Sequence, residues 1–285
     1  MNKILVLGGT GMLGAPVVRQ LQADGFAVRL LARDVAKAGA MFGDGVEIVA
    51  GDVADCDSLA GALAGCDGVH ISVGGPVDQL SAENVAALAP QQGVQRITYV
   101  SGSSVAPENA WFPMTAQKLQ AEAAVQNCGV GYTIFCPTWP MEQLPRFVAG
   151  GRALVVGVGV APWHWFAAAD FGSMVATAYR QEEAIGKRLY VHGPEAMTSA
   201  EALARYCCVF HPEIDSVTIM PVDAAREAAA AMGNTLLGQY AELMAYFKAV
   251  GERGDPAEAN RLLGAPSTTL AAWLEQKKRA QPIAA

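Results

Sequence analysis

Charged residues are scarce in this chain, and basic ones are the minority among them. Only 16% of its 285 residues are charged, and 27 acidic residues against 20 lysines and arginines give a formal net charge of −7. Binding to nucleic-acid phosphates or anionic lipid headgroups needs a surface rich in Lys and Arg. The composition therefore predicts neither nucleic acid nor a membrane surface as a partner.

Long apolar runs and cysteine pairs are also missing. The first apolar run, Ile4 to Leu7, is shorter than the core of a secretory signal peptide, and no later run approaches the length of a membrane span. The six cysteines are scattered without a C-x-x-C pair, which argues against a zinc site and a disulfide scaffold. We expect a cytoplasmic protein without a metal site.

Apolar residues, by contrast, make up 52% of the chain, enough for a large buried core. Helical patterns near 12–24, 57–64, 77–92 and 114–127 alternate with apolar strand-like runs. These runs are Lys3–Leu7, Ala27–Ala32, Val46–Ala50, Gly68–Ser72, Arg96–Ser101 and Gly131–Cys136. Repeated βαβ units of this kind predict an α/β fold with a doubly wound parallel Rossmann sheet.

Beyond Pro137 the regular alternation stops, because prolines and glycines become frequent. We expect a strand near Ala153–Val156, a helix near Asp170–Arg180, a strand near Arg188–Val191 and an Ala-rich helical tail. The expected division is a cofactor-binding domain over 1–150 and a smaller C-terminal α/β substrate lobe over 151–285. Strands and helices of the second part are free to return to the first domain.

Three glycines follow the first predicted strand at G-x-x-G-x-x-G spacing and open an amphipathic helix. In this context one glycine permits the tight turn, one admits a pyrophosphate to the backbone, and one lets the helix pack on the strand. A purely structural turn is the alternative. We expect a dinucleotide to contact the loop at Gly8, Thr10, Gly11, Met12, Leu13 and Gly14.

Arg33 ends the second predicted strand, where an NAD-preferring site would carry an acid. A guanidinium there can pair with a 2′-phosphate, and Lys37 adds charge one helical turn later. The alternative is a solvated surface arginine. This pattern predicts NADP(H) as the cofactor.

Small and acidic residues end the third and fourth predicted strands. The carboxyl ends of parallel strands form the ligand crevice of open α/β sheets. We therefore expect these residues to complete the cofactor cleft: Asp52, Val53, Ser72, Val73 and Gly74.

With these motifs in place, the sequence resembles the atypical short-chain dehydrogenase/reductase superfamily, and within it the NmrA-like group. The resemblance covers roughly residues 1–200 and rests on GGTGMLG at 8–14, Arg33, GDV at 51–53, YVSGSS at 99–104, Lys118 and CPTWPMEQL at 136–144. It implies NADP(H) binding with contacts from Ser101, Lys118 and Pro137, and a substrate contact from Ser103.

Catalytic members of that superfamily use a Tyr-x-x-x-Lys pair, in which the lysine binds the ribose and the phenol donates a proton. Here the position four residues before Lys118 is Met114, which cannot donate a proton. Resemblance to the lysine-only reductases implies that Lys118 binds the ribose or acts as the acid itself. The alternative is an exposed helix lysine. Tyr99 is interpreted as a core aromatic.

Several aromatic residues fall in irregular segments after the predicted strands. They would line the mouth of an apolar substrate pocket, or else only fix the lobe to the sheet. His164 lies between two of them and is a candidate proton donor, with a structural histidine as the alternative. The candidate substrate-binding residues are Ser103, Trp111, Met114, Trp139, Trp163 and Trp165.

These observations favour an NADP(H)-dependent oxidoreductase acting on a hydrophobic, aromatic or quinoid small molecule. A quinoid ring delocalises the charge that hydride transfer delivers, so it tolerates the missing tyrosine. The second hypothesis is a non-catalytic NADP(H)-sensing regulator that binds a protein partner. A third is a tailoring oxygenase of aromatic polyketides on the same fold, because the fold alone does not fix the chemistry.

Overall fold

A computed structural model describes residues 2–157 and 161–280 and divides the chain into two compact units. Unit 1 comprises Met1–Pro137, Ala168–Val191 and Asp255–Pro266. Unit 2 comprises Thr138–Ala167, His192–Gly254 and Ser267–Ala285. The boundary expected at residue 150 thus falls after Pro137, and two later segments return to unit 1.

Unit 1 is built on a seven-stranded sheet in the order β11-β6-β5-β4-β1-β2-β3, and every neighbouring pair is parallel. Its strands are β1 (Lys3–Leu7), β2 (Ala27–Ala32), β3 (Glu47–Ala50), β4 (Gly68–Ile71), β5 (Arg96–Val100), β6 (Gly131–Pro137) and β11 (Lys187–Val191). The strand order reverses beside β1, which confirms the doubly wound Rossmann sheet. The first six strands were predicted to within one residue at each end.

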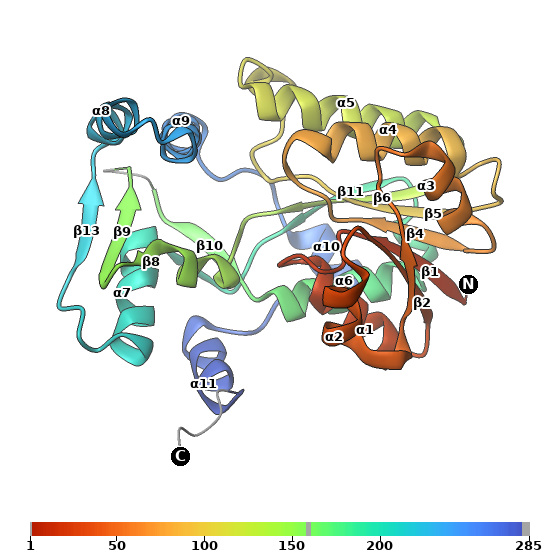
Figure 1. Ribbon diagram of the computed structural model, residues 1–285, viewed down its shortest axis with the longest axis horizontal. Coiled ribbons are helices and arrows are strands. Elements are labelled where there is room, and N and C mark those ends of the chain that lie inside the picture. The colour runs from red at the N-terminus through yellow and green to blue at the C-terminus, as the bar shows by residue number, and fades with distance from the viewer. Residues whose placement is uncertain (1, 158–160, 281–285) are drawn as a thin grey trace. The chain divides into compact units, whose positions relative to one another are not determined.

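Helices cover both faces of this sheet, with α3, α4 and α5 on one face and α1 and α6 on the other (Figure 1). The helices of unit 1 are α1 (Gly14–Ala23), α2 (Val35–Phe42), α3 (Cys56–Leu63), α4 (Asp78–Leu88), α5 (Pro113–Asn127), α6 (Ala168–Ala178) and α10 (Ala257–Leu263). The sequence left open whether elements of the second part return to the first domain. Both α6 and β11 do so, and β11 pairs in parallel with β6 as the edge strand of the sheet.

Unit 2 contains two small sheets, β12-β10-β7 and β13-β9-β8. Their strands are β7 (Trp139–Pro140), β8 (Val148–Ala149), β9 (Arg152–Val156), β10 (Trp163–Phe166), β12 (Glu195–Met197) and β13 (Val217–Met220). The helices are α7 (Ser199–Phe210), α8 (Val222–Met232), α9 (Thr235–Val250) and α11 (Leu270–Ala280). An α/β lobe with a helical tail was predicted, and this unit matches that description.

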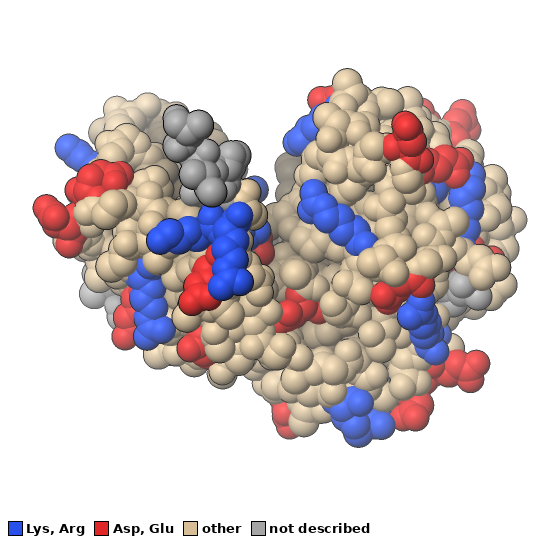
Figure 2. All heavy atoms as spheres, turned by 90° about the horizontal axis from the view of Figure 1, so that it is seen from below, with Lys and Arg blue, Asp and Glu red and all other residues tan. Residues whose placement is uncertain are grey.

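Charges are distributed sparsely over the surface. On the face shown in Figure 2, lysines and arginines lie singly or in small groups with acidic residues among them. Among the described residues, no helix is both long and apolar enough to cross a membrane.

A chain of polar side chains crosses the core of unit 1. His70 on β4 is fully buried, and its Nδ1 lies 2.8 Å from Oγ1 of Thr98 on β5. Thr98 Oγ1 in turn lies 2.9 Å from the hydroxyl of Tyr179. Burial lowers the pKa of His70 from 6.5 to about 3, because the core cannot solvate an imidazolium. The native protein therefore holds His70 neutral.

This burial predicts a pH-dependent stability. Below pH 6.5 the unfolded chain protonates His70 and the native state does not, so stability is lost as the pH falls from 6.5 toward 3. Between pH 6.5 and 5 the loss from this residue is about 2 kcal/mol. Urea unfolding of the wild type and His70→Phe at both pH values measures it. Equal pH dependence of the two proteins would contradict the assignment.

Candidate cofactor and active site

The glycine loop between β1 and α1 is shaped by two close backbone approaches. Gly8 has a φ of +78°, and a Cβ there would lie 2.3 Å from the carbonyl oxygen of Ser72 at the end of β4. A Cβ on Gly14 would lie 2.2 Å from the carbonyl oxygen of Gly8. Both positions therefore require glycine, as turn and packing residues respectively.

Gly11 differs from these two glycines. It is exposed, its φ is not in the left-handed region, and a Cβ would meet only the Gly8 oxygen, at 3.0 Å. The helix that follows has no acidic residue in its first turn, and its N-cap residue Leu13 makes no side-chain cap. A helix N-terminus of this kind attracts anions such as a pyrophosphate.

A cavity of about 120 Å³ opens beside this loop at the carboxyl ends of β1 to β4. Nine of the predicted cofactor residues do not line it: Gly11, Met12, Leu13, Gly14, Ser72, Gly74, Ser101, Lys118 and Pro137. Sequence reasoning missed Gly9, where a Cβ would lie 2.5 Å from Leu30 Cδ1. The lining residues are Gly8, Gly9, Thr10, Leu31, Ala32, Arg33, Gly51, Asp52, Val53 and Val73.

Arg33 supplies the positive charge of this cavity. It is exposed and makes no hydrogen bond or ion pair with any residue that the structure describes. The neighbouring acid Asp34 caps α2 by accepting a hydrogen bond from the Lys37 backbone N–H at 2.9 Å. The cation rather than the acid is therefore available to a ligand.

Local hydrogen bonds hold the loop after β3. Asp52 Oδ1 accepts from the Ala54 N–H at 2.9 Å, and the Asp52 N–H donates to Ser58 Oγ at 3.1 Å. The carbonyl oxygen of Val53 accepts from the Asn84 side chain on α4. These hydrogen bonds fix the positions of Asp52 and Val53, which line one side of the cavity.

Lys118 on α5 belongs to a buried ionic network, which excludes the alternative of an exposed helix lysine. Its Nζ lies 2.6 Å from Asp78 Oδ2 and donates to the Val100 carbonyl oxygen at 3.0 Å. The side chains of Lys118 and Asp78 are only 15% and 8% exposed. The third N–H has a longer contact, 3.4 Å to the Tyr99 hydroxyl, so it is the proton most available to a ligand.

Tyr99 is fully buried, which confirms the prediction of a core aromatic. Its hydroxyl donates to Asp78 Oδ1 at 3.1 Å, and burial together with the Asp78 charge raises the pKa of Tyr99. Met114, one turn before Lys118, is half-buried. Asp78 was missed, because an acid at the first residue of a helix is common without any function.

The two serines after β5 that were predicted to contact cofactor and substrate, Ser101 and Ser103, are buried. The Ser101 hydroxyl donates to Glu122, whose carboxylate pairs with Arg188 Nε at 2.9 Å. Ser103 is buried, and its backbone N–H donates to the Pro137 carbonyl oxygen at 3.0 Å. In the structure these contacts join the end of β5 to β6 and β11, and the predicted ligand contacts of Ser101, Ser103 and Pro137 stay predictions.

Three predicted substrate-binding tryptophans lie in the core of unit 2. Trp165 is fully buried and its indole N–H donates to the Met197 carbonyl oxygen at 3.0 Å. Trp139 and Trp163 pack edge-on against Phe247, with ring centroids 5.3 and 5.2 Å away. Core packing covers all three, which favours the packing alternative over an open mouth. Their contacts with a substrate stay predictions. Trp111 in unit 1 is 61% exposed, and its substrate contact stays a prediction.

His164 is not the isolated histidine that the sequence suggested. Its Nδ1 lies 2.5 Å from Glu252 Oε1, and its ring stacks on His192 at a centroid distance of 5.3 Å. Neither partner is visible from sequence, since Glu252 lies 88 residues further along the chain. The role of proton donor stays a prediction.

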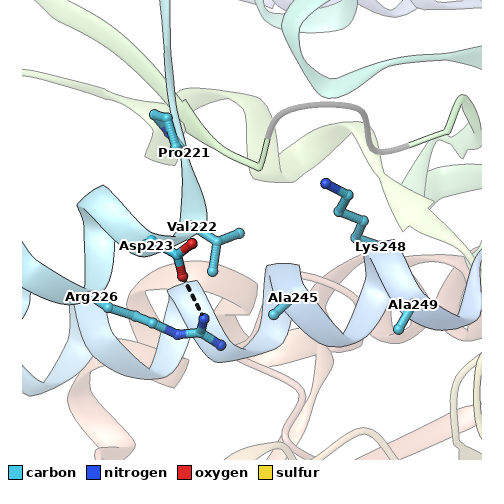
Figure 3. A pocket seen from close by; sticks show the side chains of 7 residues that line it. All are labelled: Pro221, Val222, Asp223, Arg226, Ala245, Lys248 and Ala249. Atoms are coloured by element: carbon cyan, nitrogen blue, oxygen red, sulfur yellow. Dashed lines mark hydrogen bonds and ion pairs between the residues drawn. The ribbon is translucent and has the colours of Figure 1, made fainter.

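A larger cavity of about 500 Å³ lies between α8 and α9 in unit 2. Figure 3 shows Arg226 at its edge, bound to Asp223. Arg226 also pairs with Glu242 at 2.6 Å, so its charge is already neutralised. We assign the candidate active site to unit 1 rather than to this cavity.

Comparison with known proteins agrees with this geometry. The sequence model of a family described as NAD(P)H-binding matches residues 8–153. A (4-alkanoyl-5-oxo-2,5-dihydrofuran-3-yl)methyl phosphate reductase of Streptomyces griseus is 32% identical over 228 residues, covering 79% of each chain. An NAD(P)H azoreductase of Xenophilus azovorans is 28% identical over 239 residues, covering 81% of each chain.

Among solved structures, the NADPH-dependent quinone oxidoreductase of Escherichia coli, solved with NADPH, aligns with a TM-score of 0.78 and 22% identity. The alignment covers 96% of this chain and 99% of that one, and it shows a shared fold. The chain belongs to the family described as NAD(P)H-binding. Its relatives support the general class of NAD(P)H-dependent oxidoreductase.

The glycine geometry predicts different effects at two positions of the loop. Gly11→Val places a side chain on the exposed face of the loop, so dinucleotide affinity should fall at least about 100-fold while the fold is kept. Gly14→Ala, the control, forces a clash with the backbone and should lower the melting temperature. Fluorescence titration with NADPH and thermal unfolding measure both effects. Unchanged binding by Gly11→Val would place the dinucleotide elsewhere.

Proposed function

We propose that this chain is an NADPH-dependent reductase of hydrophobic quinoid or aromatic small molecules. The observation that carries the proposal is the cavity beside the glycine loop, which is lined by Arg33. Arg33 makes no ion pair with the described residues, so it can pair with a 2′-phosphate. When bound, the cofactor supplies a hydride. The glycine loop holds the pyrophosphate, and Arg33 selects the phosphorylated ribose by a charge-assisted contact.

The acid–base groups of the site support the choice of a quinoid or aromatic substrate. Met114 stands where a tyrosine would donate a proton, and the Lys118 ammonium is held by Asp78 with one N–H in only a long contact. Such a site assists protonation weakly. Quinones and azo compounds suit it, because their rings or nitrogen atoms delocalise the incoming charge, and relatives are named for an azo activity and a quinone activity.

Turnover distinguishes this proposal from the NADP(H)-sensing alternative. The purified chain is mixed with NADPH and a panel of quinones, azo dyes and aromatic ketones, and absorbance at the nicotinamide band is followed. Oxidation that depends on acceptor and protein supports the reductase. Tight NADPH binding without oxidation of any acceptor would favour the sensor, which a pull-down of protein partners then examines.

Cofactor preference is the first quantitative prediction for this function. NADPH should bind about ten- to a hundredfold more tightly than NADH, because a charge-assisted contact contributes roughly 1.5–3 kcal/mol. Arg33→Ala should remove most of the difference. Lys37→Ala, an exposed cation one turn away, is the matched control and should change it less. Equal affinities in the wild type would refute the role of Arg33.

The second prediction separates a catalytic role of Lys118 from its structural role in the ion pair with Asp78. Lys118→Met should lower kcat by about 100-fold, the usual scale for losing an acid–base group. Asp78→Asn breaks the same ion pair but keeps the amine, so it should lower the melting temperature with a smaller loss of kcat. If both variants lose stability equally and keep kcat, Lys118 has only a structural role.

A further inference from the structure

A group of three metal-ligating side chains lies in unit 2, outside the cofactor cavity. One ligand atom from each of His164, His192 and Glu252 lies within 4.8 Å of the others. Both imidazoles direct Nδ1 at the same carboxylate oxygen, Glu252 Oε1, at 2.5 Å from His164 and 3.5 Å from His192. His192 and Glu252 are mostly buried, with side chains 8% and 14% exposed, whereas His164 is 39% exposed.

Local backbone features bring these distant residues together. His192 directly follows β11, and Gly193 lets this segment lie against β10, since a Cβ there would overlap the Trp165 carbonyl oxygen at 1.6 Å. Helix α9 ends at Gly251, whose φ of +65° turns the chain so that Glu252 follows at once. The backbone N–H of His164 then donates to Glu252 Oε2 at 2.6 Å and fixes the carboxylate.

The hydrogen-bond partners determine which ring nitrogens can serve as ligands. His192 Nε2 lies 3.2 Å from the carbonyl oxygen of Arg253, an acceptor only, so Nε2 carries a proton. The other ring nitrogen, Nδ1, is the one that faces Glu252 Oε1 and can serve as a ligand once it is deprotonated. A backbone carbonyl behind a ligating imidazole is also the usual outer partner in metal sites.

We propose that His164 Nδ1, His192 Nδ1 and Glu252 Oε1 bind a divalent transition-metal ion of the Zn²⁺ type. Two imidazoles and one carboxylate form a ligand set that such ions accept, and three protein ligands leave a fourth position for water. Zn–N bonds of about 2.0–2.1 Å set tetrahedral ligand atoms roughly 3.3 Å apart. The 3.5 Å contact already fits this spacing, and the 2.5 Å contact lengthens when the metal replaces the proton of His164.

This site is independent of the proposed reductase function, because it is built from unit 2 residues and is tested without turnover. It ties β10 to the segments that follow β11 and α9, so metal binding should stabilise the folded protein.

Zinc uptake by the chelator-treated full chain tests the proposal. Titration of Zn²⁺ against a chromophoric chelator should give about one tight equivalent per chain, and thermal unfolding should shift to higher temperature. His192→Gln and Glu252→Gln should each weaken binding at least about 100-fold, because loss of even an outer partner costs 10–100-fold. His211→Gln is the matched control: His211 faces Glu213 at 3.2 Å in the same unit but has no third ligand. It should keep full uptake.

Tetrahedral bands of bound Co²⁺, lost in His192→Gln, would give a spectroscopic signature of the same ligands. The proposal is overturned if the wild type takes up no more zinc than His192→Gln, or if all variants bind alike. It is also overturned if the melting temperature changes with pH but does not change when Zn²⁺ is added. If Glu252→Gln fails to fold, the proposal is decided by comparing the wild type with His192→Gln in zinc uptake and in the Co²⁺ spectrum.

Discussion

The close approach of Gly8 to the Ser72 carbonyl oxygen is the constraint on which the cofactor site depends. At the point where strand order reverses, the chain after β1 must turn beside the end of β4 before α1 begins. A side chain at Gly8 would push the two strand ends apart, and one at Gly14 would displace the helix. Because both spaces stay empty, the first residues of the glycine loop and Arg33 line one cavity.

Around this loop, buried charges hold the rest of unit 1 in place. Lys118 with Asp78 joins α5 to α4, while Glu122 with Arg188 joins α5 to β11. A buried charge without its partner is costly, so such pairs fix the positions of the elements that carry them. Lys118, which the family pattern marks as catalytic, therefore also stabilises the fold. An activity measurement on a Lys118 variant must separate the loss of catalysis from the loss of stability.

Local sequence patterns predicted the positions of the strands of unit 1, but they did not predict the burial of the tryptophans of unit 2. Alternating apolar runs predicted β1 to β6 because strand formation depends on neighbours in sequence. The sequence left open whether the three tryptophans of unit 2 line a pocket or pack in a core, because an aromatic in an irregular segment can do either, and the structure buries them. The boundary at residue 150 was misplaced because nothing local shows that β11 returns to pair with β6.

The sequence by itself determined the Rossmann sheet, the glycine loop and the cation after β2, because glycine spacing and apolar periodicity act over a few residues. Only the tertiary structure decided which distant side chains meet. It placed Asp78 against Lys118, which are 40 residues apart, and set Glu252 against both His164 and His192. Those pairings follow from long-range packing, in which Gly193 permits a close approach to the Trp165 backbone and Gly251 a positive-φ turn after α9.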